Sequence, residues 1–407
     1  MNARGRSAAP ESSHAAHHTA SMIANDSNLF AWNYRARAAE LGAPIVPIID
    51  AHAHVAGLDA APILKEAMDL YGIEQIWSMT SNIDDVEGLR RILGERIAFI
   101  AIPNWRAPNL RESHGHGYAQ QIRKYHALGA RVAKFWAAPR GIDMGTQAGD
   151  PALMRLDNPV RVAAIETAVE LRMTLMVHVA DPDTWFATKY ADAAKYGSKR
   201  QQYEPFESLM DRFPVQWIAA HMGGWPEDLD FLDGLLERHR NLVLDASATK
   251  WMVREISRHP RERVLQFFTR WRDRLLFGSD IVTSNAHLTE TPGGTEMDSK
   301  AQSRESAFDL YASRYWALRT LWETDWIGSS PIADGDLALV DPSRSPKDSP
   351  TLRGMKLPRE LLLPFLRENA QRILREAVQR SANQPTAQRE SLHATSQRTS
   401  ASRSSGA

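Results

Sequence analysis

The chain has 407 residues, with 49 basic and 49 acidic side chains, 14 histidines and no cysteine. The formal net charge of zero excludes the positive field with which proteins hold nucleic acid or an anionic membrane surface. The absence of cysteine excludes disulfides, thiolate zinc ligands, iron–sulfur clusters and a cysteine nucleophile. Any metal ion must therefore be held by histidine, aspartate, glutamate or a modified lysine.

No apolar run of the sequence is long enough to span a membrane. Residues 1–25 also lack the apolar segment of a secretory signal. We therefore expect a cytoplasmic protein that contacts neither nucleic acid nor a membrane.

The two ends of the chain differ in composition from the part between them. Residues 1–28 are rich in Ala, Ser and His, and residues 381–407 are rich in Ser, Thr, Gln and Arg. Both segments are predicted to be disordered tails. Residues 29–380 are predicted to form one domain, because an α/β barrel can exceed ~250 residues as a single unit.

Eight short β-rich apolar runs alternate with amphipathic helical patterns through the predicted domain. The runs cover residues 45–51, 75–80, 97–103, 131–137, 173–179, 215–220, 242–248 and 275–281. Several are apolar at consecutive positions, which is typical of parallel strands buried on both faces. Two of the helical patterns are residues 157–171, which begin near Asn158-Pro159, and residues 226–239. Eight successive units of about 30 residues predict a (β/α)8 TIM-type barrel rather than an open doubly wound sheet.

Three of the predicted connections are longer than a minimal loop. Residues 139–156, 181–202 and 283–304 follow the fourth, fifth and eighth strands. In a barrel all three emerge on the catalytic face, so they are predicted to extend its walls. Residues 327–356 are predicted to be an irregular excursion between helices at 305–323 and 358–380.

A His-x-His pair ends the first predicted strand. His52 and His54 are two residues apart, so on a strand both imidazoles project to the same side. Two neutral imidazoles at that separation supply half of a site for a first-row metal ion. Such pairs also occur by chance, and the remaining strand ends therefore decide the interpretation.

Four other predicted strands carry an ionisable or ligating side chain near the carboxyl end. These residues are Lys134, His178, His221 and Asp280. Each has an ordinary structural explanation, such as a hydrogen-bonded core histidine or an aspartate that caps a helix. Packing alone does not explain why five strands supply such groups to one rim, where barrel enzymes have their active sites. The pattern favours a metal site.

The pattern resembles the amidohydrolase superfamily of metal-dependent barrel enzymes, in particular the amidohydrolase-related (amidohydrolase 2) branch, which includes decarboxylases and hydratases beside hydrolases. The resemblance covers residues 48–374. Its motifs are HAH at 52–54, Lys134, HVADPDTWF at 178–186, YEPFESLMDRFP at 203–214, IAAHMGG at 218–224, RDRLLFGSD at 272–280 and RENAQRIL at 367–374. The motifs are specific for the superfamily and weak as to substrate.

The resemblance implies a divalent ion, by preference Zn²⁺, on His52, His54, His178 and Asp280. It further implies that Asp280 accepts a proton from the activated water and that His221 polarises the substrate or acts as general acid–base. Lys134 is open to three interpretations. A carboxylated Lys134 would bridge two ions, a cationic Lys134 would neutralise a substrate carboxylate beside one ion, and the third role is purely structural.

The rim of the pocket is predicted from loop position. Trp136, Arg140, Trp185 and Trp225 follow the fourth to sixth strands and are expected to contact the substrate. An aromatic lining suits a flat or apolar organic molecule, and Arg140 would grip a carboxylate. The alternative is that the tryptophans pack under loops and that Arg140 forms a surface ion pair.

The leading hypothesis is a metal-dependent hydrolase that cleaves a C–N or C–O bond, in an amide, lactone or ester, with metal-activated water. The first alternative is a non-oxidative decarboxylase of an aromatic or unsaturated carboxylic acid. The second alternative is a catalytically silent barrel that binds a ligand. The expected partner is a small-molecule substrate, and a homodimer is also expected because homodimers are frequent in this family.

Overall fold

The computed structural model describes residues 23–290, 292 and 295–382 of the chain. The remainder of the two predicted tails, 1–22 and 383–407, lies outside the described residues. The fold begins earlier than the predicted boundary at residue 28, because Ser27 and Asn28 are buried. The Asn28 side chain donates a 2.9 Å hydrogen bond to Asp309, which anchors this segment to the domain.

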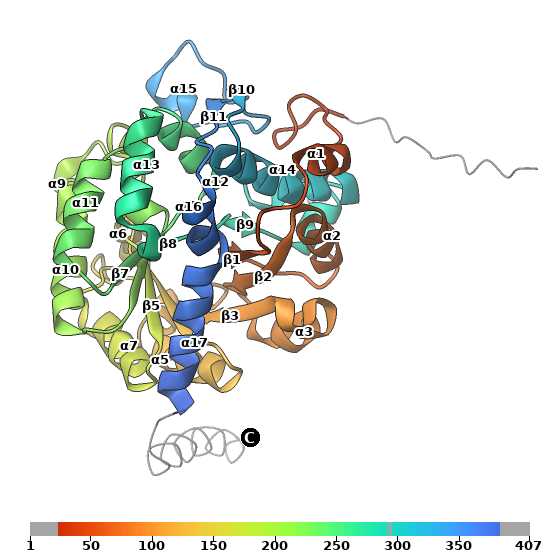
Figure 1. The fold of residues 1–407 in the computed structure, drawn as a ribbon. Helices are drawn as coiled ribbons and strands as arrows, with labels where there is room; N and C mark the ends of the chain where they lie inside the picture. The colour runs from red at the N-terminus through yellow and green to blue at the C-terminus, as the bar shows by residue number, and fades with distance from the viewer. Residues whose placement is uncertain (1–22, 291, 293–294, 383–407) are drawn as a thin grey trace, which may run out of the picture.

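Parallel strands form the centre of the described part of the molecule (Figure 1). They are β1 (Ile48–His54), β2 (Ile73–Ser78), β3 (Ile97–Ala101), β4 (Val132–Trp136), β5 (Thr174–His178), β6 (Trp217–Ala219), β7 (Leu242–Asp245), β8 (Leu275–Leu276) and β9 (Ile281–Val282). Their order in the sheet is β8-β7-β6-β5-β4-β3-β2-β1-β9. Each of the eight predicted runs therefore overlaps a strand, and the strands β1 to β8 follow one another around the sheet in chain order.

The eighth predicted strand is split into β8 and β9, and the two pieces close the barrel. β8 pairs with β7, whereas β9 pairs with β1. Between them, the carbonyl of Phe277 accepts from the amide of Ala51 and the amide of Asp280 donates to the carbonyl of His52. The chain thus stays beside β1 across the break, and the predicted TIM-type barrel is confirmed.

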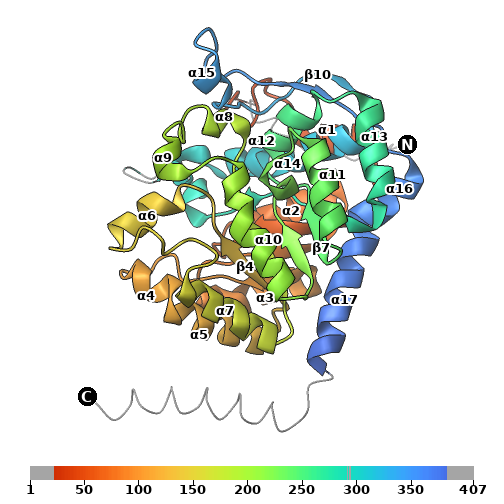
Figure 2. The same cartoon turned by 90° about the vertical axis from the view of Figure 1, so that its left-hand side faces the viewer.

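Helices surround the strands (Figures 1 and 2). They are α1 (Tyr34–Leu41), α2 (Ala61–Tyr71), α3 (Val86–Leu93), α4 (Leu110–His114), α5 (His116–Ala127), α6 (Gly141–Gln147), α7 (Pro159–Glu170), α8 (Asp183–Phe186), α9 (Ala193–Tyr196), α10 (Tyr203–Arg212), α11 (Leu229–Arg238), α12 (Thr249–Trp251), α13 (Arg261–Arg270), α14 (Arg304–Glu323), α15 (Leu337–Val340), α16 (Arg359–Leu363) and α17 (Asn369–Ala382). No helix among the described residues combines the length and the apolar character needed to cross a membrane.

The two helices predicted in most detail begin at capping residues. Asn158 caps α7 by accepting a hydrogen bond from the amide of Val160, and Pro159 occupies the first helical position. Asp228 caps α11 by accepting from the amide of Phe231, so this helix starts a few residues after the predicted position. The predicted final helix is interrupted by a π-helical turn at Pro364–Glu368, which joins α16 to α17.

The long connections carry short elements of their own. The predicted loops at 139–156 and 181–202 contain α6, α8 and α9. The predicted excursion at 327–356 contains α15 and an antiparallel pair of strands, β10 (Ile327–Ser329) and β11 (Thr351–Arg353). α15 and the β10–β11 pair lie at one end of the molecule, and α17 runs toward the opposite end (Figures 1 and 2).

The barrel interior is a separate apolar cluster from the layer between strands and helices. It contains Ile49, Ala51, Trp77, Met79, Ile100, Ile102, Val132, Met176, Ile218, Val243 and Leu276, together with Ala370 and Ile373 of α17. The strand residues between these positions, such as Leu175 and Val177 of β5, belong to the outer cluster. Residues two apart on a strand face the same side. Lys134, His178 and Asp245 therefore point into the barrel, as the interior apolar residues two positions before them do.

The first strand departs from this alternation at its carboxyl end. Ile49 and Ala51 belong to the interior, but Ala53 belongs to the outer cluster. The pairing of β1 with β2 shifts register between Asp50 and Ala53, as in a β-bulge. A bulge re-aims the residues that follow it, and here it directs His52 and His54 inward.

Candidate metal centre

Three side chains from the first and eighth strand regions place potential metal ligands together. The Oδ1 atom of Asp280 lies 3.4 Å from His52 Nε2 and 3.3 Å from His54 Nε2. Two ligand atoms each about 2.1 Å from a tetrahedral ion lie about 3.4 Å apart, so both distances fit one ion. Two imidazoles and a carboxylate are also a donor set that Zn²⁺ and similar ions prefer. The residues present therefore fit a divalent metal ion.

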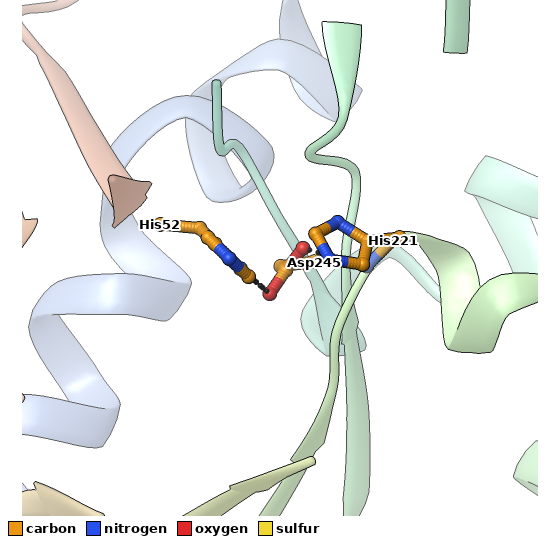
Figure 3. Close-up of side chains that lie close together, drawn as sticks. All are labelled: His52, His221 and Asp245. Carbon is orange, nitrogen blue, oxygen red and sulfur yellow. Dashed lines mark hydrogen bonds and ion pairs between the residues drawn. The ribbon is translucent and has the colours of Figure 1, made fainter. Parts of the chain in front are cut away.

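A carboxylate behind His52 fixes which ring nitrogen faces the candidate site. His52 Nδ1 lies 2.8 Å from Asp245 Oδ2 (Figure 3). An ionised carboxylate can only accept, so Nδ1 carries the proton and donates it. The lone pair of His52 therefore resides on Nε2, the atom that lies near Asp280. Such a carboxylate–histidine pair is a frequent support of histidine metal ligands.

The same carboxylate orients His221 through a serine. Ser247 Oγ donates to Asp245 Oδ1 and lies 2.7 Å from His221 Nδ1. Because the single hydroxyl proton is directed to the carboxylate, the hydroxyl oxygen accepts from His221 Nδ1. Asp245 Oδ1 also accepts from the backbone amide of His221 at 2.9 Å. His221 Nε2 is thus the nitrogen left for proton transfer, and Figure 3 shows Asp245 between the two rings.

The electrostatics of the cluster favour the protonation states that bind metal. Burial lowers the pKa of His52, and burial lowers that of His221 well below its usual value despite the nearby Asp280 charge. Burial alone would raise the pKa of Asp280, but the hydrogen bond from His54 and the electrostatic interaction with the neighbouring histidines bring it well below the usual range. Asp245 shows the same net direction because of His52. Neutral rings and ionised carboxylates are the ligand forms that metals require.

Lys134 lies directly beside the candidate ligands. Its Nζ atom is 3.3 Å from His52 Nε2, where the ammonium donates to the lone pair. Burial lowers the pKa of Lys134 to about 8, although the charges of Asp245 and Asp280 oppose the shift. The side chain therefore lies inside the candidate centre and lines its cavity, and the choice among the three interpretations of Lys134 stays open.

His178 lies in the same pocket but outside the three-residue group. Its ring centroid is 4.6 Å from that of His221. His178 Nε2 is 2.9 Å from Asp181 Oδ1, and the other oxygen of Asp181 accepts from the Tyr190 hydroxyl at 2.7 Å. This arrangement leaves His178 Nδ1 as the nitrogen with a free lone pair. The ligand role of His178 stays a prediction.

Strained backbone accompanies the functional strand ends. His221, Ala248 and Asp280 have φ angles of 59°, 65° and 60°, a region that residues with a Cβ rarely occupy. The adjacent Gly278 packs so closely that an added Cβ would lie 2.9 Å from Ser247 Cβ and 3.0 Å from His52 Cβ. Strain of this kind persists where surrounding structure holds it in place and often marks functional sites.

The cluster opens into a cavity of about 1180 Å³. Its lining includes the predicted residues Trp136 and Arg140, together with Trp105, Arg106 and Trp251. Of the other predicted substrate contacts, Trp185 lines a smaller neighbouring cavity. Trp225 lines neither cavity, because it stacks on Tyr203 and packs against Phe231 in the outer layer.

Sequence reasoning missed Asp245 and Ser247. Asp245 ends β7 after Leu242–Leu244, so it has the same signal as the other strand ends, namely a polar side chain after an apolar run. Ser247 had no such signal, because a serine after a strand is ordinary. Its role is visible only in its contact with His221. Trp251 likewise reaches the cavity from the short helix α12, and nothing in its sequence context indicates this.

A (β/α)8 barrel that gathers histidines and aspartates at the carboxyl ends of its strands has the architecture of metal-dependent barrel enzymes. A family model described as "Amidohydrolase" matches residues 109–375 of this chain. The match spans more than half of the sequence, and the chain belongs to this amidohydrolase family. The matched range includes Lys134, His178, His221 and Asp280, and begins after His52 and His54.

Solved structures provide distant similarities. One is 5-carboxyvanillate decarboxylase from Novosphingobium aromaticivorans in complex with manganese and 4-hydroxy-3-methoxy-5-nitrobenzoic acid, with 12% identity, a TM-score of 0.40, and coverage of 81% of this chain and 96% of that chain. Another is an amidohydrolase from Burkholderia multivorans with bound zinc, with 13% identity, a TM-score of 0.36, and coverage of 81% and 99%. A third is a D-hydantoinase, with 12% identity, a TM-score of 0.38, and coverage of 68% and 71%. The chain has no match among curated proteins.

Proposed function

We propose that the protein is a metal-dependent hydrolase that cleaves a C–N or C–O bond in an amide, lactone or ester of a small organic substrate. The observation that carries this proposal is the convergence of His52, His54 and Asp280 beside His221 in one cavity. The set combines ligands for an ion with a histidine whose proton position is fixed. A ligand-binding barrel without catalysis would need no such combination.

The proposed centre holds one divalent ion, by preference Zn²⁺, on His52, His54 and Asp280, with His178 as an additional ligand. When bound, the ion supplies Lewis acidity, which lowers the pKa of a coordinated water towards neutrality and polarises a substrate oxygen. Catalytic zinc sites commonly combine about three protein ligands with an open position. The partly exposed Asp280 and His54 face the cavity from which that position is reached.

The chain's own residues would move the protons. Asp280 is held ionised by its histidine neighbours, and its carboxylate accepts a proton from water. His221 lines the cavity and its Nδ1 is engaged by Ser247, so its free Nε2 would first take up the proton that Asp280 accepts from water and then pass it to the departing nitrogen or oxygen. Asp245 stabilises the charge that His221 acquires, through the serine hydroxyl that bridges them.

The lining of the cavity favours a second candidate function, the non-oxidative decarboxylation of an aromatic or unsaturated acid. Trp105 and Trp136 meet edge to face with ring centroids 5.9 Å apart, which offers flat walls for an aromatic ring. Arg106 and Arg140 supply cations at the same cavity. In this reaction His221 Nε2 would take up a proton from solvent and deliver it to the carbon that loses the carboxylate.

Metal analysis followed by a substrate screen tests the proposal. We expect about one ion per chain in the wild type, loss of the ion in Asp280→Asn, and retention in the exposed control Asp273→Asn. Lactones, amides and esters should be hydrolysed without CO₂ release, and His221→Ala should lose turnover while it keeps the ion. CO₂ release from hydroxybenzoates, abolished in His221→Ala, would support decarboxylation instead.

The number of ions decides the role of Lys134. One ion per chain, with activity independent of bicarbonate, agrees with an uncarboxylated lysine. Two ions, with bicarbonate-dependent activity that Lys134→Met loses, would establish a carboxylated bridge. A wild-type protein purified with no stoichiometric metal, and unable to bind added Zn²⁺, would overturn the proposed centre.

A further inference from the structure

A second cavity lies beside the candidate metal centre. Its volume is about 370 Å³, and it shares Arg140, Trp251, Asp280, Val282 and Met297 with the lining of the larger cavity. The two cavities therefore meet at Asp280 and Trp251. We call the smaller one the side cavity.

Basic side chains outnumber acidic ones in the lining of the side cavity. The basic residues are Arg140, Lys189, Lys250, Lys300 and Arg314, and the acidic residues are Asp280, Glu296 and Asp336. The acidic groups already have partners. Asp280 faces the histidines, Glu296 lies 3.4 Å from Lys300, and Asp336 lies 3.7 Å from Lys189.

Lys250 and Arg314 have no ion-pair partner in the described part of the chain, where no carboxylate oxygen lies within 4.0 Å of either side-chain nitrogen. Among the described residues, Arg314 donates to two hydroxyls, at 2.8 Å to Ser27 and 2.9 Å to Ser313. The carboxylate of Asp334, which acts on Lys250 at longer range, is engaged by Arg254. Two cations thus line a cavity without a bonded counter-charge.

The pKa values of Arg314 and Lys250 are both lowered, as expected for buried cations without an ion-pair partner. Burial lowers the pKa of Arg314 to about 10. Burial also lowers the pKa of Lys250, and the charges of Lys300 and Arg314 lower it further, while Asp334 and Asp336 oppose the shift. Unpaired buried charge is unfavourable, so an anion that enters the side cavity would be stabilised by hydrogen bonds and by charge.

We propose that the side cavity binds an anionic group of carboxylate or phosphate type through Lys250 and Arg314, and that this group is a remote acidic substituent of the substrate. The second part rests on the proposed function, because it places the reacting bond of the same substrate at the metal centre. The shared boundary at Asp280 and Trp251 allows one molecule to occupy both cavities. The substrate class is then an amide, lactone or ester that carries a second, non-reacting acid group.

Titration of the metal-loaded protein with inorganic phosphate, followed by calorimetry, tests the anion site. We expect saturable binding to the wild type, about tenfold weaker binding to Lys250→Met, and near wild-type binding to Lys250→Arg. The control is Lys65→Met, which removes an exposed cation paired with Asp69 on α2 and should bind phosphate as the wild type does. Circular dichroism and the metal content of each variant establish that the fold is retained.

Equal phosphate affinity in the wild type and Lys250→Met would overturn the anion site, because it would place phosphate elsewhere, for example on the metal alone. This readout needs no turnover. It can therefore succeed when no screened compound is hydrolysed, in which case only the proposed function fails. Conversely, if the protein hydrolyses a screened compound but binds phosphate independently of Lys250, the anion site in the side cavity is refuted and the proposed function is not.

Matched substrates identify the source of the anion. For pairs of hydrolysable compounds with and without a remote carboxylate, the wild type should prefer the acid by about tenfold in kcat/KM, and Lys250→Met should lose the preference mainly through KM. Phosphate should raise KM for the acid and leave KM for its neutral analogue unchanged. Lys250-dependent phosphate binding without any substrate preference would overturn the assignment to the substrate, and would identify a free anion as the occupant.

Discussion

Asp245 on β7 accepts a hydrogen bond from His52 on β1, with 2.8 Å between Oδ2 and Nδ1, across the position where β8 and β9 are split. The same carboxylate reaches His221 through the hydroxyl of Ser247. One buried charge therefore sets the proton positions of a candidate metal ligand and of the candidate acid–base. The two functions can be separated experimentally.

The first prediction concerns Asp245→Asn, which keeps the shape of the side chain but removes its charge. The amide no longer compels His52 to carry its proton on Nδ1, so we expect metal affinity to fall about 10- to 100-fold. Competition with a chelator measures this affinity. Asp69→Asn, on the surface of α2, serves as the control and should retain wild-type affinity. Unchanged affinity in Asp245→Asn would contradict the assigned tautomer.

The second prediction concerns Ser247→Ala, which removes the hydroxyl between His221 and Asp245. His221 then loses the partner of Nδ1, while His52 keeps its direct bond to Asp245. We expect kcat to fall about tenfold or more with little change in KM and with full metal content. Ser247→Thr, which keeps a hydroxyl, should recover part of the rate. Equal losses of metal in Ser247→Ala and Asp245→Asn would argue for a purely structural role.

The third prediction concerns Gly278→Ala. The new Cβ would press on the Cβ atoms of Ser247 and His52, which are fixed to the backbone and cannot rotate away. We expect a loss of about 1–3 kcal/mol in the free energy of unfolding, together with weaker metal binding. Urea unfolding and chelator competition measure the two effects. Gly234→Ala in α11, where the new methyl meets only the end of Arg238, should retain metal binding and stabilise the helix.

The fourth prediction concerns the pH dependence of stability. His114 is fully buried, and within the described residues neither ring nitrogen has a hydrogen-bond partner. Burial lowers its pKa from 6.5 to about 3, and Arg161 contributes to the shift. Below about pH 6.5, His114 binds a proton in the unfolded chain but stays neutral in the folded protein. The free energy of unfolding therefore falls as the pH drops from about 6.5 to about 3.

We expect the contribution of His114 to this fall to approach ~1.4 kcal/mol per pH unit. The stability of His114→Phe should therefore decline less steeply than that of the wild type between pH 6.5 and pH 4.5. Urea unfolding at a series of pH values measures both slopes. Identical slopes would show that His114 gains a proton as readily in the folded state as in the unfolded state.

The strand order and the rim of polar strand ends were predictable because both follow from local patterns. An apolar run that ends in His178, His221 or Asp280 reports burial and exposure along a single strand. The inward orientation of His52 was not predictable in this way. Period-two counting from Ile49 and Ala51 points His52 outward, and only the bulge in β1 reverses it.

Long-range contacts account for the rest of what the sequence did not reveal. Ser247 is ordinary in sequence and gains its role from a contact 26 residues away with His221. Trp225 follows a strand as expected, yet the turn at Met222–Gly224 directs it to the outer layer beside Tyr203. The split of the eighth strand likewise arises from its bonds to β1 and to Phe365 of the last helical segment.

Ala370 and Ile373 of α17 pack into the barrel interior, so this helix closes one end of the barrel. Substrate, product and water must then enter and leave at the other end of the barrel, where the candidate ligands lie. A nonsense mutation that removes α17 would uncover the apolar side chains that fill the barrel interior at this end and expose them to solvent. A truncation upstream of Asn369 should therefore yield insoluble protein.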